Sequence, residues 1–492
     1  MIMKKLLAVL SLGFVGAAVA VPTVSVTSVV QNPATRALTI GYTLSGEAAV
    51  VTMGSVTTNG AAMAETDLLV VTGDANRLVQ PGSHSLVWQP SAETGFGPFD
   101  ANAVVVSLKA WSTNAPPDYM VIDLMDKARG VRYYTCKEAI PGGIGDDRYK
   151  TDYLVMRRIP AAGIVWRMGS PSTELGAANY RAKEKTQKVK LTEDYYCGVY
   201  MTTYRQTYWL NGASFLNGGN GGDHPAMNVL NWGWDWPQTD IQYCTYRGWF
   251  HEANCSYLKG LGDAQAQYEN DEVYKYWPRD GHDIVVKSSD KCKACMSGTY
   301  NPTLGIFRNN YGFEFDFLSD AQWEFACRGG EANGGHALSS GKELEDVTAS
   351  ENLGELGWYS ENSTVTHVTT TNAITAAMPH PVGQKKPNGY GLYDMHGLMF
   401  EAVLDEIADH LNTDEVLEDP KGGTSPCLRS RVMVARGGSF CTIAQHCRVA
   451  RRENNSVTSL WNDYHNAKVQ DGNKIFSRSK GYRFWLPCKA VK

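Results

Sequence analysis

Short alternating runs dominate the first quarter of the chain and limit the folds that it can adopt. Between residues 21 and 115, apolar and polar residues alternate over four or five positions at a time, with no helical period. A period of two places every second side chain on one face, as a half-buried β-strand requires. The predicted strands are Thr23–Thr27, Ala37–Ile40, Val50–Met53, His84–Trp88 and Val104–Leu108.

Turn dipeptides separate these runs: Asn32-Pro33, Asn59-Gly60, Gly73-Asp74 and Pro81-Gly82. Such residue pairs favour tight turns. Strands of this length and spacing predict a small all-β sandwich over residues 21–115. The segment has no cysteine and a single histidine, His84, so we interpret it as an adhesive or spacer module without chemistry of its own.

The first twenty residues have the order of a secretory signal peptide. Lys4 and Lys5 precede an apolar run from Leu6 to Val15, and Ala18-Val-Ala20 is a small-residue cleavage site. We therefore expect residues 1–20 to be removed and the mature chain to be secreted or periplasmic. A retained anchor helix is the alternative, although the apolar run is short for a membrane span and no later run is longer.

Composition narrows the remaining possibilities. A chain of 492 residues predicts two or three domains, and a net charge of −5 argues against a nucleic-acid partner. The high content of glycine (48), tyrosine (25) and tryptophan (13) indicates a loop-rich domain filled by aromatic rings. In an exported protein, most of the eleven cysteines are expected in disulfides, with at least one left over.

A proline pair in Asn114-Ala-Pro-Pro-Asp118 marks the end of the first domain, because paired prolines stiffen a connection and interrupt strands. We expect residues 116–149 to be a linker or junction and residues 150–492 to form the second domain. Two helices are predicted there by capping boxes. They begin at Thr203-Tyr-Arg-Gln206 and Ser319-Asp-Ala-Gln322 and end at Asn211-Gly212 and Gly329-Gly330.

A series of short motifs follows along the second domain. In order they are Met168-Gly-Ser-Pro171 with Glu174, Val199-Tyr-Met-Thr-Thr203, His224-Pro-Ala-Met-Asn-Val229, Gln322-Trp-Glu-Phe-Ala-Cys-Arg-Gly-Gly330, His380-Pro-Val-Gly383, Pro387-Asn-Gly-Tyr-Gly-Leu-Tyr-Asp-Met-His-Gly397, Arg436-Gly-Gly-Ser-Phe440, Arg448-Val-Ala-Arg451 and Gly481-Tyr-Arg-Phe484. Together they resemble the formylglycine-generating enzyme, or sulfatase-modifying factor, domain family over residues 150–487. The resemblance implies an α+β, C-type-lectin-like fold with sparse secondary structure.

The resemblance also implies an activity: oxidation of a cysteine in a Cys-x-Pro-x-Arg segment of an exported protein, using O₂ and a copper(I) ion. Soft thiolates are the ligands that copper(I) prefers. Carried onto this chain, the copper ligands and catalytic residues would be Cys441 and Cys447, and Ser439 would position substrate or oxygen. Cys441 lies one residue earlier than the family pattern. If the segment is extended, that shift turns its side chain to the other face.

Three interpretations of Cys441 and Cys447 stay open: a structural disulfide between themselves or with other cysteines, a copper-binding or redox-active pair, or buried inert thiols. His446 is either a residue that tunes Cys447 or a polar surface residue. The family's Gly-Asn-Val-Trp-Glu-Trp loop is Gly397-Leu-Met-Phe-Glu-Ala402 here, so Glu401 is kept but the asparagine and both tryptophans are replaced.

Characterised relatives carry structural calcium, which takes oxygen ligands. The resemblance points to Asn388, Gly389 and Gly391 as the residues that would hold it, and an ordinary Pro-Asn-Gly turn is the alternative. Residues 236–312 match the family poorly and are expected to be an insertion with Cys244, Cys255, Cys292 and Cys295. Disulfides that pin this insertion are favoured over zinc or thioredoxin-like chemistry, because the cysteine spacing suits neither.

Two functions from different classes remain. The first is a copper-dependent oxidase acting on an exported protein substrate, and the second is a non-catalytic lectin-like or structural module that holds a glycan or protein ligand. The chain contains no H-E-x-x-H, G-x-S-x-G or Walker A motif that would indicate another chemistry.

Overall fold

The structure is a computed structural model that divides into two compact units, Met1–Ser112 and Thr113–Lys492. The residues that it describes are 21–64, 71–89, 103–126, 130–178, 181–211, 311, 313, 315–330, 335–368, 373–377, 379–407, 409, 414–420, 432–456, 480–481 and 483–488. The predicted signal peptide and nearly all of the predicted insertion, with its four cysteines, lie outside these residues.

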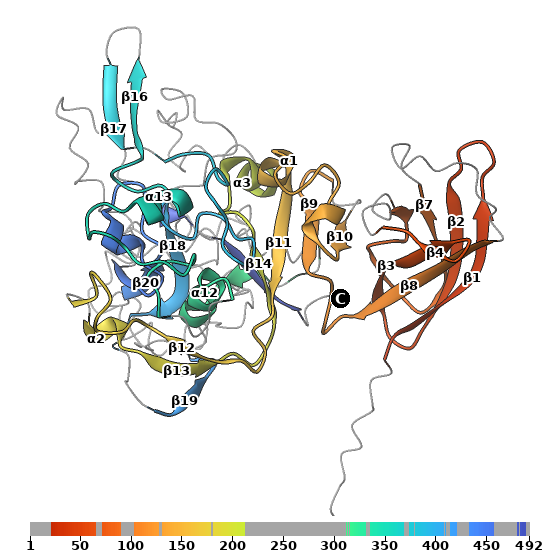
Figure 1. Cartoon of the computed structure of the whole chain (residues 1–492), viewed down its shortest axis with the longest axis horizontal. Coiled ribbons are helices and arrows are strands. Elements are labelled where there is room, and N and C mark those ends of the chain that lie inside the picture. Colours follow the sequence, from red (N-terminus) through yellow and green to blue (C-terminus); the bar gives the residue numbers. More distant parts are fainter. Residues whose placement is uncertain are drawn as a thin grey trace, which may run out of the picture. The chain divides into compact units, whose positions relative to one another are not determined.

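Unit 1 consists of two antiparallel sheets (Figure 1). One has the order β1-β2-β7-β5 and the other joins β4, β3 and β6, with β8 also paired to β3. The strands are β1 Thr23–Gln31, β2 Leu38–Ser45, β3 Ala49–Thr58, β4 Ala61–Ala62, β5 Val71–Gly73, β6 Leu78–Val79, β7 Gly82–Trp88 and β8 Val104–Ser112.

Both sheets of unit 1 contribute to one hydrophobic core. Alternate residues of β2, Leu38, Ile40, Tyr42 and Leu44, are buried and pack with side chains of β3, β7 and β8. This agrees with the alternation read from the sequence, since every predicted run lies at a strand. Asn59 and Gly60 both have positive φ values (51° and 81°), as a tight turn between β3 and β4 requires.

The main sheet of unit 2 has six strands in the order β10-β9-β11-β14-β23-β15. Its first two strands, β9 Tyr119–Asp123 and β10 Val131–Tyr134, lie in the segment that we expected to be a junction. All five residues of β9 are buried, and β9 pairs with β11. The sheet of the second unit therefore begins at Tyr119, before residue 150, because Pro116 and Pro117 interrupt the chain only briefly.

The other strands of the main sheet are β11 Tyr153–Ile159, β14 Tyr195–Gly198, β15 Asp316–Phe317 and β23 Phe484–Pro487. Smaller sheets contain β12 Val165–Met168, β13 Gln187–Lys190 and β19 Val416–Glu418; β16 Thr364–Val368 and β17 Ala373–Ala377; and β18 Phe400–Glu406, β20 Val432–Arg436, β21 Glu453–Ser456 and β22 Lys480–Gly481. Within the described residues, the helices are α1 Arg148–Thr151, α2 Arg181–Glu184, α3 Tyr204–Asn211, α12 Asp320–Cys327 and α13 Glu351–Leu356, with 3₁₀ turns η4 Lys137–Ala139 and η7 Ala444–Cys447.

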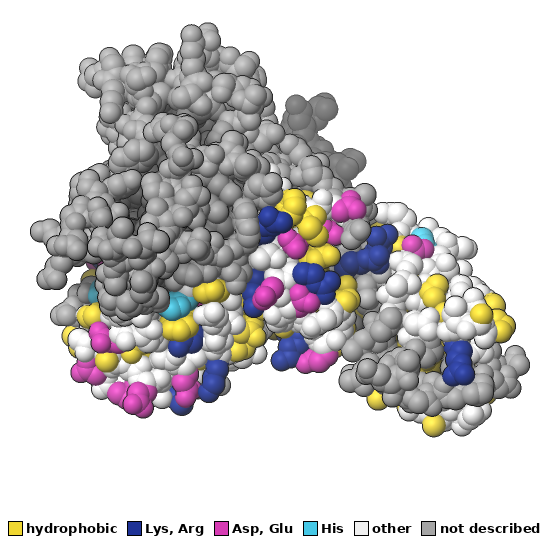
Figure 2. Space-filling model, turned by 90° about the horizontal axis from the view of Figure 1, so that it is seen from above, with side chains coloured by type: hydrophobic (Ala, Val, Ile, Leu, Met, Phe, Trp, Pro, Cys, Tyr) yellow, Lys and Arg dark blue, Asp and Glu magenta, His cyan; other side chains and the backbone are white. Residues whose placement is uncertain are grey.

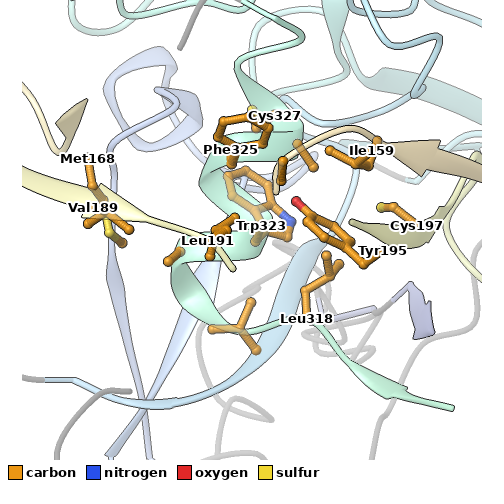
Figure 3. Close-up of a cluster of buried hydrophobic side chains, with 14 of the residues drawn as sticks. Ile159, Met168, Val189, Leu191, Tyr195, Cys197, Leu318, Trp323, Phe325 and Cys327 are labelled. Carbon is orange, nitrogen blue, oxygen red and sulfur yellow. The ribbon is translucent and has the colours of Figure 1, made fainter. Parts of the chain in front are cut away.

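Helix α12 lies in a core cluster that joins several elements of unit 2. Trp323, Phe325 and Cys327 of this helix pack among Tyr195 and Leu318 and aliphatic side chains of β11–β13 (Figure 3). The Tyr195 hydroxyl donates to the Gln322 carbonyl at 2.6 Å, which ties β14 to the helix. Short elements thus gain their stability from one another rather than from length.

Both predicted capping boxes are confirmed. Ser319 Oγ accepts from Gln322 N at 3.2 Å while Gln322 Oε1 accepts from Ser319 N at 2.9 Å, and α12 runs from Asp320 to Cys327. The same reciprocal bonds join Thr203 and Gln206 at the start of α3, which ends at Asn211 as expected. Among the described residues, no helix has the length and apolar character needed to cross a bilayer.

Candidate functional site

The segment with Ser439, Cys441 and Cys447 follows β20 directly. The chain leaves the sheet at Arg436 and passes through Gly437 and Gly438, whose φ values are 86° and 74°. A β-carbon at position 438 would lie 2.5 Å from Cys447 Sγ and 2.9 Å from the His446 carbonyl oxygen. Gly438 is therefore required twice, for its backbone conformation and for the close approach of the Cys447 sulfur.

Residues 439–442 form a turn, not an extended segment. Thr442 N donates to the Ser439 carbonyl at 3.0 Å, and Ser439 N donates to Thr442 Oγ1 at 3.0 Å. Cys441 lies on this turn and is exposed, and its Sγ is 3.4 Å from the hydroxyl oxygen of buried Ser439. The alternation expected of a strand does not apply here, because the turn decides which way Cys441 faces.

Cys447, in contrast, is completely buried at the end of η7. Its Sγ lies 3.8 Å from Thr442 Oγ1, and its thiol is free. Burial raises the pKa of Cys447 to about 12, with a further contribution from the neighbouring Cys441. At neutral pH, Cys447 is thus a neutral thiol enclosed by the turn.

His396 anchors the backbone of Cys447 and is a residue that the sequence analysis did not single out. Its Nδ1 lies 2.7 Å from the Cys447 carbonyl oxygen, and its Nε2 lies 2.9 Å from Ser339 Oγ and 3.1 Å from Ser339 N. The carbonyl can only accept, so Nδ1 carries the proton and Nε2 accepts from Ser339. Burial lowers the pKa of His396 to about 4, which keeps the ring neutral.

A buried network of arginines and carboxylates fixes the segment that follows Cys447. Arg448 donates to Glu174 at 2.5 Å and to Glu184 at 2.8 Å, and Arg451 donates to Glu184 at 3.4 Å. Desolvation raises the pKa of Glu174 to about 7 in spite of Arg448. These contacts join the segment after Cys447 to residues more than 260 positions earlier in the chain.

The second half of the network lies on α12. Arg436 binds Asp320 and Glu324, and Glu324 also binds Arg328 at 2.6 Å. Glu324 Oε1 accepts from Gly169 N at 2.8 Å. The charged residues of the Gly-Gly-Ser, Arg-Val-Ala-Arg and α12 motifs thus form buried ion pairs that connect elements of the domain.

The sequence model of the sulfatase-modifying factor enzyme 1-like domain matches residues 241–464. The chain carries a sulfatase-modifying factor enzyme 1-like domain. The match begins inside the segment that we expected to be an insertion, and the resemblance read from the motifs is confirmed.

Similarity to individual proteins is limited in extent. Mouse formylglycine-generating enzyme is 29% identical over 153 residues, which are 29% of this chain and 35% of the mouse protein. The chain thus spans about a third of the length of the curated relatives that it matches. Treponema denticola variable protein 1 is 19% identical with a TM-score of 0.37, covering 68% of this chain and 95% of that chain. PvdO from Pseudomonas aeruginosa is 14% identical with a TM-score of 0.39, covering 68% and 94%.

Cys441 and Cys447, the pair that the resemblance implied as copper ligands, lie in different environments in this sulfatase-modifying factor-like domain. A copper(I) site of this kind needs two thiolate sulfurs that face a common open position. Here Cys441 is exposed, whereas the Cys447 sulfur faces Gly438 and Thr442 in the interior.

The loop that the resemblance implied as a calcium site is held together by hydrogen bonds of Asn388. Asn388 Nδ2 donates to the Ala326 and Cys327 carbonyls at 2.8 and 3.1 Å, and its Oδ1 accepts from Tyr390 N and Leu392 N at 3.0 Å each. Both donors and both lone pairs of the amide are therefore used. A β-carbon at Gly389 would lie 2.1 Å from the Gly329 oxygen, so Gly389 is needed for packing. Gly391 N donates to the Asn388 carbonyl at 2.9 Å, the bond of a tight turn.

The other described cysteines do not form the disulfides that we expected. Cys136, Cys197, Cys327 and Cys488 are free thiols, and the last three are buried. The three buried thiols pack in the interior as small apolar side chains. His446 lies 3.4 Å from Glu453, so it belongs to the polar edge of the arginine network.

Proposed function

We propose that the mature chain is exported and that its sulfatase-modifying factor-like domain is a binding module for an exported protein partner. The observation that carries the proposal is the different environment of the two cysteines. Cys447 is a buried neutral thiol that closes the turn, and Cys441 is the solvent-facing member. The scaffold of the family is kept, while the paired sulfurs of a copper oxidase are not presented together.

A protein partner is favoured over a glycan because the curated relatives are formylglycine-generating enzymes, whose product is an altered amino-acid residue. The charge distribution fits a partner that is not a nucleic acid. On the described part of one face, Lys and Arg side chains are interspersed with Asp and Glu side chains (Figure 2). Nucleic-acid binding proteins instead gather basic residues into a continuous area.

A second candidate function is cysteine oxidation, and one contact favours it. The exposed Cys441 sulfur lies 3.4 Å from Ser439 Oγ, so the serine and one cysteine of the family motif remain together. In this function Ser439 would orient a substrate thiol beside Cys441, and copper would supply the O₂ chemistry once Cys447 became accessible.

One assay separates the two functions. The mature protein is incubated in air with copper and a Cys-x-Pro-x-Arg peptide, and formylglycine is sought by mass spectrometry. Binding of the same fluorescent peptide and of its serine analogue is measured by anisotropy. We expect both peptides to bind equally, with no aldehyde formed.

Two results would overturn the binding function. Aldehyde that disappears in both the Cys441→Ser and Cys447→Ser variants would establish the oxidase. Absence of peptide binding, together with retention on a glycan array, would assign the module to glycans.

A further inference from the structure

A short acidic strand pairs with a basic strand in one of the smaller sheets of unit 2. Strand β19 runs parallel to β13 and is the last strand of the sheet β12-β13-β19 (Figure 1). The segment around β19 reads Asp414-Glu-Val-Leu-Glu-Asp-Pro420, with four carboxylates in seven residues, whereas the stretch Lys183–Lys190 carries four lysines. The pairing thus joins two segments of opposite charge.

Polar contacts connect β19 to β13 and to the residues that follow it. Lys190 Nζ donates to Glu418 Oε1 at 2.6 Å, and Asp419 N donates to the Lys190 carbonyl at 2.9 Å. The Asp419 carboxylate accepts from the backbone N–H of Thr192 at 3.0 Å and from its hydroxyl. Backbone pairing and two carboxylates therefore fix the position of β19.

These contacts are made at the surface. Every residue of 414–420 is exposed or only half-buried, and the Lys190 and Glu418 side chains are 33% and 59% exposed. A second ion pair, from Lys188 to the fully exposed Asp414, is longer at 3.8 Å. Exposed ion pairs contribute little to stability and are weakened by salt. The bonds that hold β19 are thus of a kind that a second segment with the same chemistry could replace.

The strand on which β19 lies is anchored in the interior. Val189 of β13 is fully buried and packs in the core with Trp166, its partner on β12. Glu184, three residues before β13, binds Arg448 at 2.8 Å, and its carbonyl accepts from Ser170 N at 2.8 Å. Strand β13 would therefore keep its place, its lysines and a free edge if β19 moved away. A free strand edge pairs with the backbone of an extended segment.

The chemistry of β19 indicates which segments this edge accepts. Leu417 lies opposite Val189, and Glu418 lies opposite Lys190. The next residue, Asp419, accepts from Thr192. An extended segment with one apolar residue followed by two acidic residues would reproduce all three contacts, whereas a basic segment would be repelled by Lys190.

We propose that the edge of β13 is a docking site for an extended acidic segment of the protein partner, and that residues 414–420 form a strap that occupies this edge in the free protein. The inference rests on the proposed function and deepens it, since it names the part of the partner that is recognised. The partner segment would add to the sheet in place of β19, with one carboxylate on Lys190 and the next on Thr192. Because the strap belongs to the same chain, the partner has to compete with it.

The test uses a fluorescent peptide with the sequence of the strap, Asp-Glu-Val-Leu-Glu-Asp-Pro, and the full-length mature protein. Binding is measured by anisotropy with wild type and with Glu418→Lys, in which the strap is repelled by Lys190. We expect the peptide to bind Glu418→Lys about tenfold more tightly than wild type, because the competing strap is weakened. The affinity should fall as the salt concentration rises. Glu361→Lys, at an exposed glutamate outside this sheet, is the matched control and should bind like wild type.

A charge exchange at Lys190 tests the same edge with a second variant. In Lys190→Glu the strap is again repelled, but the acidic peptide should not bind. The exchanged peptide Asp-Glu-Val-Leu-Lys-Asp-Pro should bind Lys190→Glu and should not bind Glu418→Lys, in which Lys190 is retained. Urea denaturation confirms that both variants are folded.

Three results would overturn the docking site: no binding of either peptide to any of these proteins, equal binding of the acidic peptide to wild type and Glu418→Lys, or binding of the acidic peptide that Lys190→Glu leaves unchanged. Aldehyde formation in the Cys-x-Pro-x-Arg assay would refute the binding function and leave this competition measurement unaffected. The two failures are therefore distinguishable.

Discussion

The guanidinium of Arg483 donates two parallel hydrogen bonds to the carboxylate of Glu401, Nε to Oε2 at 2.7 Å and NH2 to Oε1 at 2.6 Å. Both side chains are buried. Glu401 is kept from the family's Gly-Asn-Val-Trp-Glu-Trp loop, and Arg483 comes from the last family motif. The pair joins β18 to the end of the chain.

Removing one partner of this buried ion pair should strongly lower the stability of the domain. Glu401→Gln leaves Arg483 as a buried charge without its carboxylate, so we expect a loss of about 3–5 kcal/mol in the free energy of unfolding. Glu418→Gln is the matched control, because Glu418 pairs with Lys190 at 2.6 Å at the surface and should cost less than about 1 kcal/mol. Urea denaturation followed by tryptophan fluorescence measures both; equal losses would contradict a special role for the buried pair.

Gly438→Ala should destabilise the cysteine turn by more than its backbone strain. The new β-carbon would meet the Cys447 sulfur at 2.5 Å. Gly341 has the same φ of 74° with no atom within 4 Å of its β-carbon position, so Gly341→Ala reports the backbone strain by itself. We expect Gly438→Ala to cost about 1–3 kcal/mol more than Gly341→Ala in thermal or urea unfolding. Similar losses of unfolding free energy in the two variants would mean that the turn can shift to accommodate the β-carbon at little energetic cost.

The two cysteines of the turn should react at very different rates. Iodoacetamide is expected to modify the exposed Cys441 in the native protein and Cys447 only after unfolding, since its thiol is buried with a pKa raised to about 12. Trypsin releases both cysteines in the single peptide Gly437–Arg448, so mass spectrometry reads them together. The half-buried Cys136 is an internal comparison. Labelling of Cys447 at the rate of Cys441 in native buffer would disprove the enclosed thiol.

His396 should make the stability of the domain depend on pH. Its pKa is lowered from 6.5 to about 4 in the folded state, so below about pH 6.5 the unfolded chain takes up a proton that the folded chain does not. The free energy of unfolding therefore falls as the pH drops from 6.5 to 4, by about 2 kcal/mol at pH 5 for this group. His396→Gln should flatten this part of the curve, whereas His336→Gln, at an exposed histidine, should not. Parallel curves for wild type and His396→Gln would count against the assignment.

Asn388→Asp distinguishes a capping residue from a calcium ligand. The change removes the two N–H donors to the Ala326 and Cys327 carbonyls and places a negative charge at the end of α12. We expect a loss of about 2 kcal/mol that added calcium does not restore. Recovery of stability with millimolar calcium would instead show that this loop binds calcium.

What the sequence predicted well depends on residues that are close along the chain. The capping boxes at Ser319 and Thr203 and the alternation of β2 involve neighbours within four positions, so local patterns decide them. The environment of Cys441 could not be read in this way. The direction of the Cys441 side chain follows from the turn that the Thr442 hydroxyl and the Ser439 backbone form. The argument from an extended strand does not apply to a turn.

The buried ion pairs between residues far apart in the sequence could not be predicted. Glu174 stood out only as part of a motif, although its partner Arg448 lies 274 residues later. Nothing in a single sequence pairs the two.

One substitution in a family motif becomes understandable only from the backbone. Leu398, which replaces the family's asparagine, has a φ of 60°, a conformation that asparagine tolerates better than leucine. Its side chain is fully buried in the cluster with Tyr200 and Phe440, and this burial offsets the strain.

The arginine network also decides which pieces of the chain can be produced separately. A recombinant fragment that begins at residue 241, where the family match begins, would contain Arg448 and Arg451 but neither Glu174 nor Glu184. Two cations would then be buried with none of those carboxylates, and the fragment would be expected to precipitate or to be degraded. Soluble protein should require a start before β9, so that the stretch by which the family is recognised is shorter than the stretch that must be expressed.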